Sequence, residues 1–150
     1  MQRLAIFPGS FDPFTIGHEA MVKRGLQIFD HIFIGVGVNK KKSVLSCAAA
    51  RVETIKGYYR NEPRVSVHSY DDLTIDFARR MNAKFILRGL RSVKDFEYER
   101  DMADVNRRLT GLETVILFTE PRLAAISSSV VRDLICHGHD VSAFLPKPVE

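Results

Sequence analysis

The chain alternates short stretches of strand-forming residues with longer segments whose apolar residues recur at helical spacing. The strand-forming stretches are rich in β-branched and aromatic residues and cover 4–7, 31–38, 64–70, 83–87 and 114–118. The nearly continuous apolar run at 31–38 is typical of a strand covered by helices on both faces. Regular alternation predicts an α/β fold for residues 1–150, a single doubly wound parallel five-stranded sheet with helices on both faces.

The segments between these stretches predict helices over 18–29, 46–59 and 75–81, a long helix from 92, and a short one over 130–136. The first helix carries apolar residues that we assign to the core, namely Met21, Val22, Leu26 and Phe29. Ser46 is the expected cap of the second helix. Ser92 with Asp95 three residues later forms a variant of the capping box for the long helix. The apolar stripe of that long helix consists of Tyr98, Met102, Val105 and Leu109.

The first strand leads into the loop 8–18, PGSFDPFTIGH, and this is where open α/β sheets bind ligands. Gly9 permits close approach of a ligand or a positive φ, while the two prolines fix the backbone. Thr15-x-Gly17-His18 places a hydroxyl and an imidazole at a helix N-terminus, where free amides favour an anion. This combination of residues is typical of a phosphate-binding site. A plain loop is an equal alternative on the residues alone, because neither a Walker lysine nor GxGxxG spacing is present.

Composition narrows the classes of function. At 150 residues and 45% hydrophobic, the chain suits one domain with a core, and no stretch approaches the roughly 20 apolar residues of a membrane span. The N-terminus lacks the pattern of a secretory signal and there are only two cysteines, so we expect a soluble protein of the cytoplasm. The net charge of +4 suits nucleic acid, and equally a site that holds several phosphates.

Two basic clusters follow predicted strands. Lys40-Lys41-Lys42 comes after the stretch 31–38, and Arg88-Gly89-Leu90-Arg91 comes after 83–87. Parallel strands end at one edge of a sheet, so both clusters should face the crevice that holds His18, although a lysine run is also common on solvated surfaces. A guanidinium fork suits phosphate oxygens. The sequence His137-Gly138-His139 reads as a helix end rather than a metal site, because no acidic or cysteine residue has ligand spacing to it.

Three motifs resemble those of one family. Residues 9–18 resemble GxFDPxTxGH, residues 88–99 resemble RGLRxxxDFEYE, and residues 126–132 resemble ISSSxVR. Together they are similar to the TxGH class of the nucleotidylyltransferase superfamily, and to the bacterial phosphopantetheine adenylyltransferase family in particular. The resemblance covers nearly the whole chain and implies a Rossmann-like nucleotidylyltransferase fold. It also implies adenylyl transfer from ATP to 4′-phosphopantetheine without a covalent enzyme intermediate, in a homohexamer built from trimers.

The resemblance assigns roles residue by residue. His18 would be catalytic and stabilise the α-phosphate, with Ser10 between the two substrates. The acceptor would be bound by Ser10, Lys42, Thr74 and Arg88. ATP would be bound by Ser10, Phe11, His18, Gly89, Leu90, Arg91, Glu99, Leu123, Ala124, Ala125, Ile126, Ser127, Ser128 and Ser129. Magnesium would accompany ATP and bridge its phosphates, with no assigned protein ligand.

Other functions stay open at this point. A sister nucleotidylyltransferase would act on nicotinamide mononucleotide or transfer cytidylyl to a polyol phosphate, although the stretch 95–99, DFEYE, argues against both. A class I aminoacyl-tRNA synthetase shares a related His-containing loop, but 150 residues leave no room for tRNA recognition. A non-catalytic nucleic-acid-binding domain should show a basic stripe with exposed aromatic residues, whereas Lys and Arg here alternate with Asp and Glu.

Overall fold

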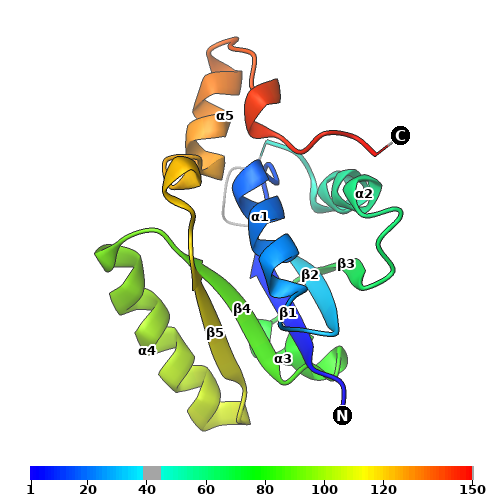
Figure 1. The fold of residues 1–150 in the computed structure, drawn as a ribbon, viewed down its shortest axis with the longest axis vertical. Helices are drawn as coiled ribbons and strands as arrows, with labels where there is room; N and C mark the ends of the chain where they lie inside the picture. Colours follow the sequence, from blue (N-terminus) through cyan, green and yellow to red (C-terminus); the bar gives the residue numbers. More distant parts are fainter. Residues whose placement is uncertain (39–44, 150) are drawn as a thin grey trace.

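The structure, a computed structural model, describes residues 1–38 and 45–149, and its strands form one sheet (Figure 1). The strands are β1 (Leu4–Gly9), β2 (His31–Gly37), β3 (Val65–Tyr70), β4 (Phe85–Leu90) and β5 (Glu113–Phe118). Neighbouring strands are parallel throughout, in the order β3-β2-β1-β4-β5. The predicted doubly wound fold is therefore confirmed. The order reverses between β1 and β4, which places a ligand crevice at the carboxyl ends of these two strands.

The helices are α1 (Ile16–Gly25), α2 (Ala48–Tyr58), α3 (Thr74–Arg80), α4 (Val93–Thr110) and α5 (Ser128–Cys136), with single 3-10 turns at Pro121–Leu123 and Ser142–Phe144. Helices α1 and α2 cover one face of the sheet and α3 covers the other (Figure 1). Residues of β1 alternate between the two cores: Phe7 packs with α1 and α2, while Ile6 packs with Phe77 of α3. None of the helices within residues 1–38 and 45–149 is long and apolar enough to cross a membrane.

Helix α1 covers Ile16–Gly25, whereas the sequence predicted a helix over 18–29, and the capping of α2 and α4 also differs from the prediction. Cys47, and not Ser46, occupies the N-cap of α2, because the amide and hydroxyl of Ser46 are turned toward a carboxylate in the first loop. Ser92 caps α4 as predicted and accepts the Asp95 N–H at 3.2 Å. The return bond of a capping box is missing, since the Asp95 carboxylate accepts the N–H of Arg91 instead.

Helix α4 runs along β5 (Figure 1), and its apolar stripe is exposed rather than packed in a core. Tyr98 and Leu109 are 63% and 66% exposed, and Glu99 is the buried residue of this helix. The stripe borders a cavity of about 340 Å³ between α4, the sheet and the start of α3, which we call the α4 groove. Helical spacing correctly identified an apolar face, but this face has no covering element within the described part of the chain.

The packing between β2 and α3 yields a test of the fold. A Cβ added at Gly35 would lie 2.5 Å from Cε1 of Phe77 and 3.0 Å from Cε1 of Tyr70, whose rings stack on each other. Gly35→Ala should therefore lower the free energy of unfolding by about 1–3 kcal/mol. The control is Gly57→Ala in α2, where a Cβ meets nothing within 4 Å, and it should stabilise by up to about 1 kcal/mol. Urea denaturation measures both, and equal stability of the two variants would contradict the packing described.

Candidate active site

A cleft of about 330 Å³ opens at the carboxyl ends of β1 and β4. Its walls come from the loop after β1, the start of α1, the end of β4, α4 and the segment before α5. Most of the residues predicted for the site line it: Ser10, Phe11, His18, Arg88, Gly89, Arg91, Glu99, Leu123, Ile126, Ser127, Ser128 and Ser129. The fold thus brings all three sequence motifs to one cavity.

The remaining predicted residues lie elsewhere. Leu90 is buried at the end of β4, and Ala124 and Ala125 follow the 3-10 turn without lining the cleft. Thr74 lines the α4 groove, where its hydroxyl lies 3.0 Å from that of Tyr70. Lys42 lies outside the described residues.

The α4 groove adjoins the cleft, because Pro8, Gly9, Arg88 and Glu99 line both cavities. Most other side chains around the groove are apolar, from α4, the sheet and the start of α3. They are Leu73, Ile75, Ile86, Met102, Ala103, Val105 and Leu109, with polar groups from Tyr70, Thr74, Tyr98, Asn106 and Thr114. The site is therefore a polar cleft joined to a largely apolar groove.

Arg88 and Glu99 form the boundary between the two cavities. Nε and Nη2 of Arg88 donate to the two carboxylate oxygens of Glu99 at 3.0 and 2.6 Å, and Nη1 donates to the carbonyl of Pro8 at 3.0 Å. These bonds use three of the five N–H groups of the guanidinium, so two remain for a ligand. Glu99, which is 7% exposed, therefore fixes the direction of the Arg88 fork.

His18 is held by the helix cap that precedes it. The N–H of Thr15, the N-cap of α1, donates to Nδ1 of His18 at 3.0 Å. In an ordinary capping box a Glu or Gln at this third helical position makes the return bond, and here an imidazole makes it. The spacing Thr-x-x-His carries this signal in the sequence, but from the sequence we assigned to Thr15 only a hydroxyl at the predicted phosphate site. Because Nδ1 accepts this bond, a neutral ring carries its proton on Nε2 and can donate it to a ligand.

The surroundings of His18 favour its neutral form. The rings of Phe7, Phe11 and Phe14 lie with centroids 6.3, 4.9 and 5.3 Å from the imidazole. Burial, which has the largest effect, and the nearby positive charges of Arg91 and Arg88 together lower the pKa of His18 to about 4. At neutral pH this residue is therefore a hydrogen-bond donor without charge.

The loop before His18 turns at Phe11. Its φ is 50°, whereas Gly9 has no positive φ, so the residue that takes the left-handed conformation differs from the one the sequence indicated. Gly9 is required for space, since a Cβ there would lie 2.9 Å from the Phe11 ring. A buried aromatic residue in this conformation is strained, and such strain is common at binding loops.

The third wall is the start of α5. Ser127 accepts the Val130 N–H at 3.2 Å as the N-cap, and the hydroxyl of Ser128 donates to the Pro13 carbonyl at 2.8 Å. Arg132, one turn into α5, lines the cleft and donates to the carbonyl of Asp12 at 2.7 Å. We did not assign Arg132 to the site, although it ends the motif ISSSxVR. With Arg88 and Arg91 it surrounds a helix N-terminus with positive charge, an arrangement that binds polyphosphate anions.

Comparison with known proteins identifies the family to which the chain belongs. Residues 6–134 match the cytidylyltransferase-like family. The phosphopantetheine adenylyltransferase of Bacteroides fragilis is 54% identical over 148 residues, which cover 99% of each chain. The phosphopantetheine adenylyltransferase of Flavobacterium johnsoniae is 48% identical over 147 residues, covering 98% of this chain and 97% of that protein.

Solved structures with the same fold include a bifunctional NMN adenylyltransferase/ADP ribose pyrophosphatase from Francisella tularensis. It superposes with a TM-score of 0.74 at 16% identity and covers 98% of this chain and 46% of its own. The same bifunctional enzyme complexed with AMP and a manganese ion superposes with a TM-score of 0.73 at 15% identity. This chain therefore spans about half the length of that enzyme, and the likeness concerns the fold.

The neutral state of His18 can be tested by NMR. Its ring should titrate near pH 4, with the proton on Nε2 above that pH, whereas an unfolded chain titrates near 6.5. The unfolded chain binds more protons between these two values, so the free energy of unfolding should decrease as the pH falls from about 6.5 toward 4. His18→Gln should remove both the resonance and this part of the pH dependence. A titration near 6.5, or a proton on Nδ1, would refute the assignment.

Proposed function

We propose that this chain, which belongs to the cytidylyltransferase-like family and within it to the phosphopantetheine adenylyltransferases, transfers the adenylyl group of ATP to 4′-phosphopantetheine. The products are dephospho-coenzyme A and pyrophosphate. The observation that carries the proposal is the pair of adjoining cavities that share Arg88. One is rich in arginines and hydroxyls, as a triphosphate needs, and the other is mostly apolar with a few polar groups, as a pantetheine arm needs.

The polar cleft is the proposed ATP site. Arg91, Arg132 and the N-terminus of α5 with Ser127–Ser129 supply donors for the phosphates. Gly89, Leu123 and Ile126 line the same cleft, and we assign them to the nucleoside side together with Leu90, Ala124 and Ala125 of the same two segments. Leu123 is buried and offers an apolar surface to the base.

The α4 groove is the proposed site of the acceptor. Arg88 has two N–H groups free for the phosphate, and Thr74 with Tyr70 and Asn106 supplies polar partners along the arm. Ser10 lines the cleft between the two substrates. Lys42, which we keep as a second cation for the acceptor phosphate, rests on the family resemblance alone.

The reaction needs no protein base. The second pKa of a phosphate monoester lies near 6, so the acceptor is largely a dianion at neutral pH and is itself the nucleophile. One of its oxygens attacks the α-phosphorus of ATP in line, a P–O bond forms, and the bond to the leaving pyrophosphate breaks with its electron pair. No enzyme intermediate arises. The neutral His18 donates its Nε2–H to a non-bridging oxygen of the α-phosphate, where negative charge gathers, while the arginines reduce the repulsion between the two anions.

Magnesium is the proposed companion of ATP and would neutralise part of the phosphate charge. Within residues 1–38 and 45–149, no three His, Cys, Asp or Glu side chains are grouped as a metal site. The Glu99 carboxylate is paired with Arg88, and Asp95 is the other carboxylate among the described residues that line the cleft. A magnesium ion held mainly by phosphates and water, with Asp95 as its nearest protein oxygen donor, suits this set of residues.

We also propose a homohexamer in the cytoplasm, as the family resemblance implies. Large apolar side chains are exposed along α4 and at the end of β5, among them Phe96, Leu109 and Phe118, and such a patch is typical of a protein interface. Cys47 and Cys136 are exposed free thiols, which suits a reducing compartment.

Sedimentation velocity should show one species of about six chains, and Leu109→Glu should shift it to smaller species. A wild-type monomer would contradict the assembly.

The acceptor assignment is tested by pyrophosphate release from ATP with a panel of acceptors. Phosphopantetheine should support rapid turnover, and pantetheine should support almost none. Without its phosphate, pantetheine offers only a hydroxyl, for which the site has no base, and leaves Arg88 without an anion. Nicotinamide mononucleotide and a polyol phosphate, the acceptors of the sister enzymes, should be poor substrates. Comparable turnover with pantetheine and phosphopantetheine would overturn both the acceptor and the mechanism.

A further inference from the structure

Two buried charged residues have no place in the site described above. Asp12 is 2% exposed and Arg51 is 5% exposed, and neither lines the cleft. Asp12 belongs to the loop after β1, and Arg51 belongs to the second turn of α2. Buried charges are costly unless every polar atom has a partner, so their retention calls for an explanation.

Both residues bind the backbone of Ser46, which directly precedes the N-cap of α2. The Asp12 carboxylate accepts the N–H of Leu45 at 2.6 Å and the N–H of Ser46 at 3.2 Å. Nε of Arg51 donates to the carbonyl of Ser46 at 3.1 Å, and its Nη1 donates to the carbonyl of Ser10. The loop after β1 and the start of α2 are thereby joined in one partly buried network, which we call the Ser46 clamp.

The clamp fixes the orientation of one peptide group beside the cleft. In a trans peptide the C=O and N–H point in opposite directions, so a Ser10 carbonyl held by Arg51 directs the N–H of Phe11 away from Arg51. Ser10 and Phe11 line the cleft while Arg51 does not, which places that N–H on the side of the cleft. Phe11, whose N–H belongs to this peptide, has a left-handed φ of 50°, a strained conformation for a phenylalanine.

The same loop is held from the opposite side by α5. Arg132 donates to the carbonyl of Asp12, and Ser128 donates to the carbonyl of Pro13. Three carbonyls of the loop, at residues 10, 12 and 13, therefore accept bonds from side chains of other elements. A guanidinium that binds a peptide carbonyl also polarises the peptide and strengthens its N–H as a donor.

We propose that Arg51 and Asp12 are positioning residues, which lock the Ser10–Phe11 peptide so that its N–H is presented to the anion in the cleft. This inference rests on the proposed function, because the anion is the reacting α-phosphate region of ATP. Donors held in place before the reaction act mainly on the transition state, so the clamp should affect turnover more than binding of ATP.

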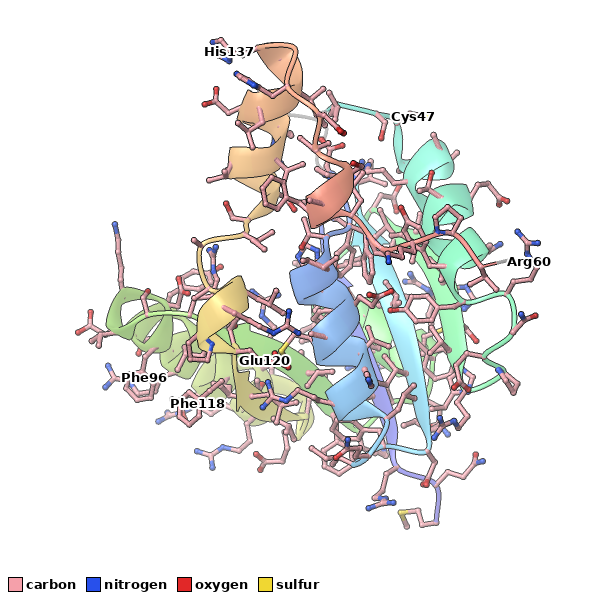
Figure 2. The ribbon with its side chains drawn as sticks, turned by 45° about the horizontal axis from the view of Figure 1, so that its top comes forward. Cys47, Arg60, Phe96, Phe118, Glu120 and His137 are labelled. Atoms are coloured by element: carbon pink, nitrogen blue, oxygen red, sulfur yellow. The ribbon has the colours of Figure 1, made fainter. Side chains whose placement is uncertain are left out.

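The test compares Arg51→Met with Arg60→Met, the same substitution at an exposed arginine just beyond α2 that Figure 2 shows on the outer side of the molecule. Arg51→Met should lower kcat roughly tenfold or more, while the KM for ATP changes by less than about threefold. Arg60→Met should match the wild type. Hydrogen exchange of the Phe11 amide should accelerate in Arg51→Met and stay unchanged in Arg60→Met.

A merely structural role predicts something different. Arg51→Met would then lower the melting temperature but leave kcat per folded molecule and the Phe11 exchange rate unchanged, and this result would overturn the proposal. If Arg51→Met does not fold, Arg51→Lys and Asp12→Asn are measured in its place, since each keeps part of the network. A kcat equal to that of the wild type in both variants would overturn the proposal. A wild type that cannot use phosphopantetheine would defeat the proposed function, whereas the exchange measurement would still decide whether the clamp orients the peptide.

Discussion

The paired hydrogen bonds between Arg88 and Glu99 are the contact on which the arrangement of the site depends. They join the end of β4 to α4, a helix that otherwise leaves its apolar stripe exposed. A partly buried charge pair is stabilising only when its geometry is good and further hydrogen bonds accompany it. Here Arg88 also donates to the Pro8 carbonyl. The result is a guanidinium between the cleft and the α4 groove whose direction is set by a carboxylate that accepts from it with both oxygens.

The distribution of charge in the cleft also suits the proposed adenylyl transfer. In the proposed reaction two anions must meet and the nucleophile is already ionised, and the positive groups that line the cleft suit such a reaction. His18 is neutral because three phenyl rings exclude water from it and two arginines oppose its protonation. A neutral donor can stabilise charge that develops during the reaction without binding the ground state too tightly.

The pattern of apolar and polar residues was enough to predict the five strands, because strand and helix periods are properties of neighbouring residues. The three motifs are likewise short runs of consecutive residues that can be read directly from the sequence. Parallel topology then places the strand ends together, which is why His18 and Arg88 could be assigned to one crevice. The contacts that orient these residues could not be predicted in the same way. Asp12 binds a residue 34 positions later, and Arg88 binds one 11 positions later, so neither pairing has a local signature. The exposed stripe of α4 shows a further limit, because periodicity identifies an apolar face but not what covers it.

The central claim is that Arg88 separates an ATP site from an acceptor site, and calorimetry on Arg88→Ala tests it most directly. Charged hydrogen bonds contribute about 1.5–3 kcal/mol, so the affinity for 4′-phosphopantetheine should fall tenfold or more. The affinity for ATP should change by no more than a few fold, because Arg91, Arg132 and the N-terminus of α5 remain in the cleft. Retained affinity for phosphopantetheine together with a large loss of ATP affinity would contradict this account of the site.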